Sequence, residues 1–554
     1  MLTAVERALA VLALAAGGYI CVTTLAMVAQ CWTALPHWDQ WDNLILGFDK
    51  LYWGVIPLDV PHWFFIQHNE HRIAVPRLIF TIDRFLVAST NKVNFFCLGA
   101  IQLSLAGLVI YIAIRASGQR IAEKIWIAGI VLALLFSAMQ WENFLWGFQV
   151  QFLGVTLAAV ATFATVASGR PSVVRLIWVI VLQSIAVYTM SSGVLVPILT
   201  VPLALWVTWP RRYVVVLGLA GAALLAGYLW GYHVPEHNDD PMRAIGHIRD
   251  VLFYVLSEMG APFGILVQEA QIGDPQRWSQ VCGAVGVLLS GGFAIDMLRR
   301  RERGGPFPTL IAAILFALGM ASLTALGRVK FGLPLSSRYS SLILLFWACL
   351  IIIAMLRLRR HGIWLGILVM VAVLPLLLCL VYYQPAFRAI GRAWTLPRLE
   401  ATTALLANVD DPKALQHSYP IAAIPWRRAP LLRERHLSIF AEEWTDWLGT
   451  PLAEHARSAD PARCRGGIDQ VSAVGDSSGA WRAGGWAWDV ERRAVPARIV
   501  FADSSGRVVG YGLTGPLKSG SGDGGGWRGH FTAAQPGSVV AFALLDGGRS
   551  ACRL

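Results

Sequence analysis

Two carboxylates near the start of the chain are the first residues whose types and spacing suit chemistry. Asp39 and Asp42 each follow a tryptophan, in a polar segment, residues 31–92, between the first two apolar stretches. On a helix, side chains three residues apart share a face, and an ionised carboxylate can take the proton from an attacking hydroxyl as a general base. We therefore expect Asp39 and Asp42 to be catalytic. The alternative is that they cap or solvate a helix at the membrane surface.

A second polar group follows in the same segment, as the run His-Asn-Glu-His-Arg. Its ionisable members are His68, Glu70, His71 and Arg72. An arginine presents a planar fork of donors that matches a phosphate, and the neighbouring side chains can orient a catalytic carboxylate. We predict that these residues bind substrate. The alternative is a polar surface turn.

Residues 141–151 form a third group, in which polar side chains lie among aromatic ones. Its polar members include Glu142, Asn143 and Gln149. Aromatic rings stack on sugar faces, whereas carboxylates and amides bind hydroxyl groups, so this composition is typical of a sugar site. The alternative is an aromatic belt at the membrane surface with a helix cap.

Membrane helices must position these groups. The chain has 554 residues, of which 56% are hydrophobic and 14% charged. Apolar runs long enough to cross a hydrocarbon core predict a mainly α-helical polytopic membrane protein with about eleven transmembrane helices. The predicted spans are residues 8–29, 93–114, 125–140, 150–166, 176–190, 194–209, 214–230, 281–298, 310–326, 340–355 and 363–382. The fifth and sixth are the least regular, because only Ser-Ser-Gly separates them.

Arginine clusters orient the predicted spans, because basic residues are retained on the cytoplasmic side. They occupy every second loop, near residues 115–124, 170–175, 211–212, 299–303 and 357–360. The N-terminus is therefore expected in the cytoplasm, and everything after residue 383 outside. The net charge of +12 is then an orientation signal, and we expect no nucleic-acid partner.

Three cations run against this rule. They lie in a loop expected on the outer face and are Arg328, Lys330 and Arg338, the last followed by Tyr339. Outer cations need either an anionic ligand, such as a lipid phosphate held above all by Arg338, or a salt bridge to an outward carboxylate. Both interpretations predict that this loop lies close to the segment 31–92.

Composition divides the chain into three parts. Residues 1–383 form the predicted membrane domain, and residues 384–463 a helical connector on the outer face. In residues 464–554, short apolar runs between Gly, Ser, Asp and Pro turns predict a small β-sandwich. Cys464 and Cys552 bracket this part and are expected to form a disulfide in an oxidising space. No cysteine or histidine spacing is typical of zinc, and residues 233–240, although rich in His and Asp, are expected to form an ordinary loop.

The layout resembles the GT-C superfamily, integral-membrane glycosyltransferases that use polyprenyl-phosphate sugars. The resemblance rests on the multi-span domain, the carboxylates Asp39 and Asp42 in the first outer loop, and the outer C-terminal domain. It implies that a first-loop carboxylate is the base, Asp39 before Asp42. The runs at 68–72 and 141–143 are similar to those of bacterial membrane proteins of this kind. The first loop lacks the adjacent acidic pair found in several branches, which leaves the base open between the two.

The resemblance also implies a function and a location. The expected reaction moves a sugar from a polyprenyl-phosphate donor to a glycan or lipid acceptor of the cell envelope, at the outer face of the bacterial inner membrane, with the site and the C-terminal domain in the periplasm. No cofactor is required, although a divalent cation (Mg²⁺ or Mn²⁺) bridging the phosphate to Asp42 or Glu70 stays open. The alternatives are a transporter or flippase of lipid-linked sugars, or a non-catalytic membrane scaffold that presents a glycan-binding β-domain.

Overall fold

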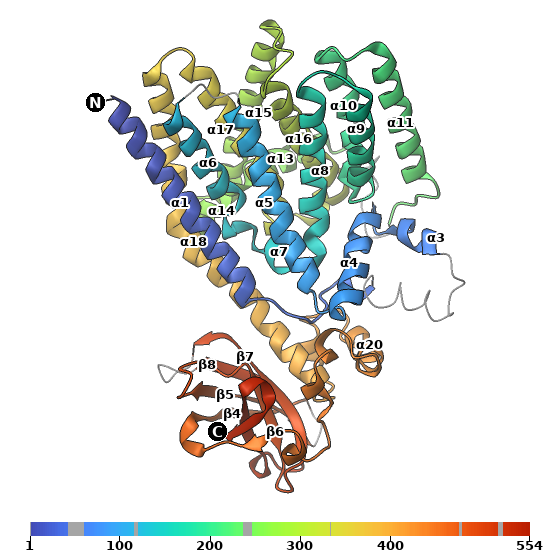
Figure 1. Cartoon of the computed structure of the whole chain (residues 1–554), viewed down its shortest axis with the longest axis vertical. Coiled ribbons are helices and arrows are strands. Elements are labelled where there is room, and N and C mark those ends of the chain that lie inside the picture. The colour runs from blue at the N-terminus through green and yellow to red at the C-terminus, as the bar shows by residue number, and fades with distance from the viewer. Residues whose placement is uncertain are drawn as a thin grey trace. The chain divides into compact units, whose positions relative to one another are not determined.

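A computed structural model describes residues 2–42, 60–115, 120–235, 246–332, 334–475, 479–518 and 525–554. The chain divides into two compact units (Figure 1). The helical unit consists of Met1–Met27, Val60–Leu78 and Phe95–Ala389, and the C-terminal unit of Val28–Asp59, Ile79–Asn94 and Ile390–Leu554. The predicted first outer segment, 31–92, is thus divided between the two units. Residues 236–240 of the predicted loop 233–240 lie outside the described residues.

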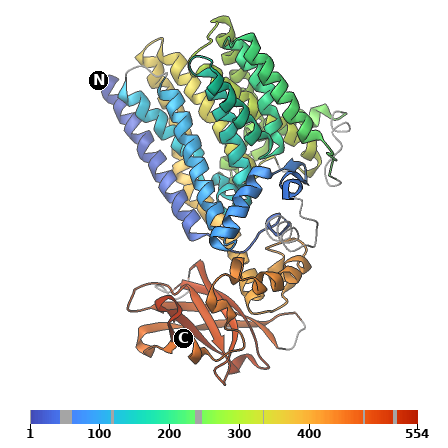
Figure 2. The same ribbon diagram turned by 45° about the vertical axis from the view of Figure 1, so that its right-hand side comes forward.

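Apolar helices build the helical unit as a bundle, which Figures 1 and 2 show from two sides. Among the described residues, nine helical stretches are long and apolar enough to cross a membrane. They are formed by α1 (Leu2–Gln30), α5 (Lys92–Ile114), α6 (Ile121–Leu135) with α7 (Trp141–Leu145), α8 (Val150–Ala167), α11 (Arg211–Leu229), α15 (Pro275–Arg299), α16 (Phe307–Arg328), α17 (Ser340–Arg359) and α18 (Ile363–Leu406). The membrane character predicted from composition is therefore supported.

The other two predicted spans are helices that are too short. α9 (Val173–Val187) has 15 residues and α10 (Leu195–Trp206) has 12. At about 1.5 Å per residue each is roughly 18–23 Å long, less than the hydrocarbon core of about 30 Å. The structure thus supports nine of the eleven predicted spans. The Ser-Ser-Gly break between this pair is a short 3₁₀ turn, Ser191–Val194.

One end of the helical unit gathers arginines from loops far apart in the chain. Glu6 pairs with Arg120 at 3.5 Å and with Arg359 at 3.2 Å. Glu302 pairs with Arg357 at 2.6 Å, whose guanidinium also lies 4.0 Å from the ring of Phe307 at the start of α16. The N-terminus and the loops near residues 115–124, 299–303 and 357–360 therefore meet at this end, in agreement with the positive-inside pattern. We call it the arginine end.

Two helices that the sequence does not reveal enter the unit from the opposite end. α13 (Ile248–Met259) and α14 (Ala261–Ala270) are bent by 70° at the break between them. Val251 and Tyr254 near the start of α13 pack on Ala325 near the end of α16, and α14 ends five residues before α15 begins. α15 ends and α16 begins at the arginine end, so the start of α15 and the end of α16 lie at the opposite end. The α13–α14 pair therefore begins and ends opposite the arginine end. This course is that of a re-entrant pair, in a region that none of the predicted spans covers.

Glycines let this re-entrant pair lie against α15. A Cβ on Gly260, at the bend, would lie 1.9 Å from the Ser279 carbonyl oxygen, and one on Gly283 would lie 1.9 Å from the Leu256 carbonyl oxygen. Real side chains do not tolerate such distances, so only glycine allows the two backbones to approach this closely. The Trp347 indole of α17 donates to the Met259 carbonyl at 2.8 Å and satisfies a carbonyl freed by the bend.

Cysteine accessibility tests the re-entrant path. With Cys379 replaced by serine, a membrane-impermeant maleimide should label His247→Cys and Ile272→Cys from the same side of sealed vesicles, because these exposed residues flank the pair. His361→Cys, at the exposed turn between α17 and α18, should be labelled only from the other side. Labelling of the first two cysteines from opposite sides would make the pair a single span.

The C-terminal part forms one eight-stranded sheet. Its order is β3-β10-β9-β6-β7-β8-β5-β4, with strands β3 (Arg457–Ser458), β4 (Cys464–Ala473), β5 (Ala480–Asp489), β6 (Arg498–Ala502), β7 (Val508–Lys518), β8 (Gly525–Thr532), β9 (Val540–Leu545) and β10 (Ser550–Arg553). The predicted β-sandwich is therefore wrong: the strands make a half-barrel. Register shifts in β4, β6 and β7 bend the sheet around its own core, so no second sheet is needed.

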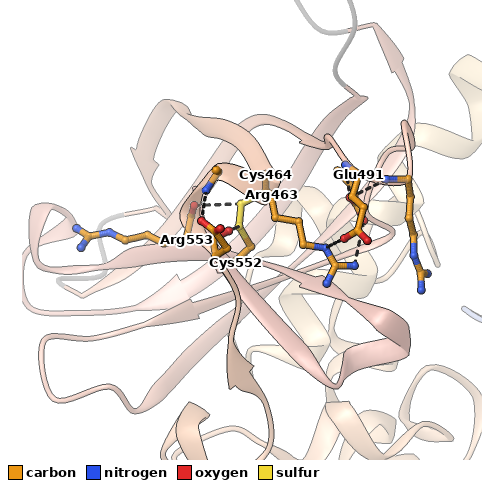
Figure 3. Close-up of a disulfide and its surroundings, with 9 residues drawn as sticks. Arg463, Cys464, Glu491, Cys552 and Arg553 are labelled. Carbon is orange, nitrogen blue, oxygen red and sulfur yellow. Dashed lines mark hydrogen bonds and ion pairs between the residues drawn. A yellow bond between two sulfur atoms is a disulfide. The ribbon is translucent and has the colours of Figure 1, made fainter.

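The predicted disulfide between Cys464 and Cys552 is confirmed (Figure 3). It joins β10, next to one edge of the strand order, to β4 at the other edge, and so ties the open side of the half-barrel. Beside it, Arg463 pairs with Glu491 at 2.7 Å and with Asp546 at 2.7 Å.

The helix that begins at Ile363 continues past the predicted domain boundary at residue 383. α18 is one helix of 44 residues that continues to Leu406, followed by α19 (Pro412–Leu415) and α20 (Ala423–Glu434). The end of α18 is fastened to the sheet: Thr403 Oγ1 lies 2.8 Å from His530 Nδ1, and His530 Nε2 lies 2.9 Å from Asp411. Arg482 also pairs with both oxygens of Asp411.

This Asp411 network is a fastening and not a catalytic triad, because Thr403, His530 and Asp411 are all buried. Burial alone would raise the pKa of Asp411, but hydrogen bonds from His530 and Arg482 lower it below its usual range. The carboxylate therefore stays ionised and caps the start of α19 through the Ala414 amide.

Removing the disulfide should loosen the half-barrel. Cys464→Ser with Cys552→Ser should lower the free energy of unfolding of the sheet by about 2–5 kcal/mol, because a long loop is no longer closed in the unfolded chain. Tryptophan fluorescence during urea unfolding of the full chain in detergent reports the midpoint. Cys379→Ser, an exposed thiol on α18, is the control, and an unchanged midpoint in the double variant would contradict the expectation.

Candidate functional site

The run at residues 68–72 is a β-hairpin held between two helices. β1 (Gln67–His68) pairs antiparallel with β2 (His71–Arg72), between α3 (Val60–Phe65) and α4 (Ala74–Val87). Asn69 takes the left-handed φ of 47° at the turn, a conformation that asparagine tolerates better than most residues. The alternative interpretation, a polar surface turn, is correct as a local shape, but His71 and Arg72 are buried.

Arg72 fixes this hairpin to the end of α11. Its guanidinium donates to the carbonyl oxygens of Tyr228 at 2.7 Å and Phe65 at 2.6 Å, and also to that of Trp230. The carbonyls that end α11 lack intrahelical donors, and a buried guanidinium supplies them. Arg72 is thus a structural clamp, and its predicted role as a phosphate ligand is not supported.

Glu70 joins the hairpin to the end of α16. Its Oε1 lies 3.0 Å from Arg328 Nη2 and 3.6 Å from His71 Nε2. His71 Nδ1 accepts from the Ser191 amide at 3.3 Å and lies 2.8 Å from the Ser191 hydroxyl. A backbone N–H can only donate, so in neutral His71 the proton lies on Nε2, toward Glu70. The predicted closeness of the Arg328 loop to the first segment is confirmed.

Charge keeps Glu70 ionised although it is mostly buried. Burial alone would raise the pKa of Glu70, but His71 and the Arg328 guanidinium outweigh it and lower the pKa to about 2. A carboxylate with so low a pKa is a weak general base at neutral pH. Glu70 therefore suits the binding and orientation of cations better than proton transfer.

Glu142 and Asn143 brace the start of α17. Glu142 Oε2 accepts from the Arg338 amide at 3.0 Å and from the Ser336 hydroxyl at 3.3 Å. Asn143 Nδ2 donates to the Arg338 carbonyl at 2.7 Å and to Ser341 Oγ at 2.6 Å. A carboxylate at a helix N-terminus satisfies donors that have no intrahelical partner. The structure thus favours the helix-cap interpretation for these two residues over direct sugar contact.

Gln149 lies in the chain between two aromatic residues, one of which contacts the hairpin and the other Tyr339. The ring of Phe148 is 5.5 Å from that of His68, and the ring of Phe152 is 6.3 Å from that of Tyr339. Gln149 is fully buried between these two contacts in sequence, and neither its amide oxygen nor its amide nitrogen has a hydrogen-bond partner among the described residues. A buried amide without partners is costly, so this position needs a ligand-based or solvent-based explanation.

Two more buried polar atoms at this end have no partner within the described ranges. Arg338 Nε and Glu70 Oε2 have none among the described residues, while the Arg338 guanidinium lies 5.4 Å from the ring of Tyr339. We call the set that combines these atoms with their neighbours the Glu70 cluster. It consists of His68, Glu70, His71, Gln149, Arg328, Arg338 and Tyr339. It offers cations, one ionised carboxylate and an amide at one end of an apolar bundle, which are the groups that bind a phosphorylated or hydroxylated ligand.

Two residues that the sequence does not single out lie in the same neighbourhood. Tyr254 and Glu258 of α13 interact electrostatically with Tyr339, and Tyr254 does so with Arg328 and Arg338 as well. Glu258 is buried, and its Oε2 has no partner within the described ranges. Glu258, an acidic residue in an apolar stretch, was the sequence signal that could have pointed to this site. The composition of residues 232–280 as a whole, however, is too polar to predict entry into the membrane.

Asp39 and Asp42 belong to the C-terminal unit. Asp42 pairs with Arg428 at 3.0 Å and accepts from the Tyr419 hydroxyl at 3.2 Å. The Asp42 amide donates to the Asp39 carbonyl at 3.3 Å, so the two residues are the ends of a single backbone turn. Trp41 anchors this turn, since its buried indole donates to Ser418 at 2.6 Å.

No group of three or more His, Cys, Asp or Glu side chains fits a metal ion within the part of the chain that the structure describes. Asp42 and Glu70, the carboxylates to which a bridging cation was left open, are each paired with an arginine.

The Glu70–Arg328 pair should make the helical unit sensitive to acid. The folded pKa of Glu70 is about 2, below the ordinary value of about 4.3, so its stabilisation is complete above pH 5 and is lost as pH falls toward 2. Glu70→Gln should therefore unfold more easily than wild type by about 2–3 kcal/mol at pH 7, with the difference shrinking below pH 4. Exposure of buried cysteines to a thiol-reactive dye measures unfolding.

Glu443→Gln, an exposed carboxylate of the other unit, is the matched control and should leave this pH profile unchanged. A double variant, Glu70→Gln with Arg328→Gln, should be less destabilised than the sum of the two single variants, because each partner alone leaves a partly buried charge. Strict additivity would show that the pair contributes nothing.

Comparison with protein-family models, with curated proteins and with solved structures finds no match for this chain. Its function must therefore be inferred from the chemistry of the Glu70 cluster and of the first-segment carboxylates.

Proposed function

We propose that the chain is a membrane glycosyltransferase that moves a sugar from a polyprenyl-phosphate donor to a glycan or lipid acceptor of the cell envelope. The observation that supports it most is Arg338, a cation at the end of an apolar bundle whose Nε is buried without a partner among the described residues. A lipid phosphate has its charge at this depth and its chain in the hydrocarbon, so it complements such a cation.

The proposed roles follow from the contacts of each residue. Arg338 binds the donor phosphate, and Tyr339 beneath its guanidinium keeps it in place. Glu70 and His71 hold Arg328 next to the same group. Gln149 offers an amide donor and acceptor to sugar hydroxyls. The leaving group is a phosphate ester, so no general acid is needed. The base is assigned to Asp39 first and Asp42 second, on the family resemblance alone.

The proposal includes an orientation. The arginine end faces the cytoplasm, as the positive-inside rule requires, and the Glu70 cluster faces the outer side. With the nine spans of the described residues and α13–α14 as a re-entrant pair, the two termini lie on opposite sides, so the C-terminal unit is periplasmic in a bacterial inner membrane. A disulfide in this unit suits an oxidising compartment.

A transporter of lipid-linked sugars is the second candidate, and the re-entrant pair favours it. Broken helices that carry an acidic residue into a membrane protein are typical of transport sites, and α13–α14 brings Glu258 to a buried position. In this candidate Glu258 is essential and Asp39 is dispensable. A non-catalytic scaffold needs neither residue.

Variants in the native host distinguish these candidates. Arg338→Gln and Asp39→Asn should each remove a sugar from a cell-surface glycan while the lipid-linked donor accumulates. Loss of a general base typically lowers the rate by about 10²–10⁴-fold, so the glycan should fall below detection in Asp39→Asn. Mass analysis of the glycan and of the lipid fraction gives both readouts.

Arg360→Gln, a partly exposed arginine at the arginine end, is the matched control and should leave the glycan intact at equal protein levels. Loss of the glycan in Glu258→Gln but not in Asp39→Asn or Asp42→Asn would favour the transporter. An unchanged glycan in every variant would exclude both candidates.

A further inference from the structure

The second face of the half-barrel carries polar and aromatic side chains instead of core residues. Along β5, Ala483 and Ala487 point into the core together with Trp527 and Phe531 of β8. Side chains alternate along a strand, so Arg482, Gly484 and Trp486 lie on the other face. β4, β5 and β8 are neighbours in the sheet (Figure 1).

A pocket opens on this second face, where the end of α18 lies against the sheet. Its volume is about 130 Å³, and its polar lining consists of Glu400, Gln470, Ser472, Arg482, Arg528 and His530. The strand register explains why they meet: Arg482 is opposite both Ser472 and His530, and Gly484 is opposite both Gln470 and Arg528.

Gly484 lies beneath two of the side chains that line the pocket, Arg528 and Gln470. A Cβ at this position would lie 2.4 Å from Arg528 Nη1 and 2.7 Å from Gln470 Nε2. Two hydrogen-bond donors from different strands thus converge over one glycine, which a larger residue would prevent. Convergent polar groups in a small pocket fix the orientation of a small ligand.

The charges of this pocket are already balanced within the protein. Arg482 pairs with Asp411, and Arg528 lies 3.4 Å from Glu400. A net cationic pocket would select an anion, whereas balanced charges and neutral side chains offer both donors and acceptors. Gln470 and Ser472 have this double capacity, which matches hydroxyl groups.

Trp486 adds an apolar surface beside the polar pocket. It lies on the same face, two residues beyond Gly484, or about 7 Å along the strand. Its neighbours across the sheet are Gly467 on β4 and Gly526 on β8, so no side chain from either paired position stands beside the indole, which is half-buried. A flat ring next to convergent donors and acceptors suits a ligand with one apolar face and several hydroxyls.

We propose that this face of the half-barrel binds a neutral pyranose unit of a glycan, with its hydroxyls in the pocket over Gly484 and its apolar face, or that of the next ring, on Trp486. Gln470 and Arg528 donate to the hydroxyls, while Glu400 and Ser472 accept from them. The site is independent of the proposed transferase activity, because it lies within the C-terminal unit and its occupancy needs no turnover.

Direct binding to the full-length protein in nanodiscs tests the site. Calorimetric titration uses three neutral disaccharides (cellobiose, chitobiose and mannobiose) and two anionic probes, glucuronate and inorganic phosphate. At least one neutral disaccharide should bind saturably. Trp486→Ala and Gln470→Ala should each weaken that binding by about tenfold, which corresponds to about 1.4 kcal/mol.

Trp278→Ala is the matched control, because it removes a half-exposed tryptophan of the helical unit and should leave the affinity unchanged. An intact disulfide on a non-reducing gel shows that a variant has folded, and Gln470→Ala carries the test if Trp486→Ala does not fold. The proposal is overturned if no neutral disaccharide saturates the wild-type protein, if both variants bind as wild type does, or if only the anionic probes bind.

Discussion

An acidic and a basic side chain that leave bulk water at the end of an apolar helix bundle must compensate each other, and the helical unit depends on one such pair. Glu70 and Arg328 meet at 3.0 Å although 258 positions separate them in the chain. Their contact brings the first-segment hairpin to the end of α16, and His71 extends it to Ser191 between the two short helices. Removing either partner leaves a partly buried charge, so the arrangement of Arg338, Tyr339 and Gln149 around the hairpin rests on this pair.

Polar residues at this end of the unit serve two physical purposes. Arg72 and Glu142 satisfy backbone groups that helix ends leave without partners, and so they stabilise the frame. Gln149 and Arg338 keep buried atoms without partners among the described residues, which costs stability. Natural proteins retain such costs mainly at sites of function. The proposed ligand-binding role is assigned to Gln149 and Arg338 because of this difference in hydrogen bonding, and not because of their residue types.

The C-terminal unit is rigid for reasons that bear on the pocket over Gly484. The disulfide ties β4 to β10, and the buried Asp411 network fastens the end of α18 to β5 and β8. Both constraints act on the strands that line the pocket, so its donors are held in place before any ligand arrives. Preorganisation of this kind favours binding because little entropy is lost when the ligand enters.

Apolar run length predicted eleven spans, of which nine correspond to helices long enough to cross a membrane. Arginine spacing predicted the arginine end. Both signals act because hydrophobic burial and charge retention are local along the chain. Cysteine positions alone pointed to the disulfide. The sequence also singled out most of the Glu70 cluster, since outer cations such as Arg328 demand a partner. It did not reveal that Arg72 satisfies a helix end, that α13–α14 enters the helix bundle, or that a single curved sheet forms the half-barrel. Those outcomes depend on which backbone groups lack partners and on where glycines let backbones approach, and only contacts between residues distant in the chain decide them.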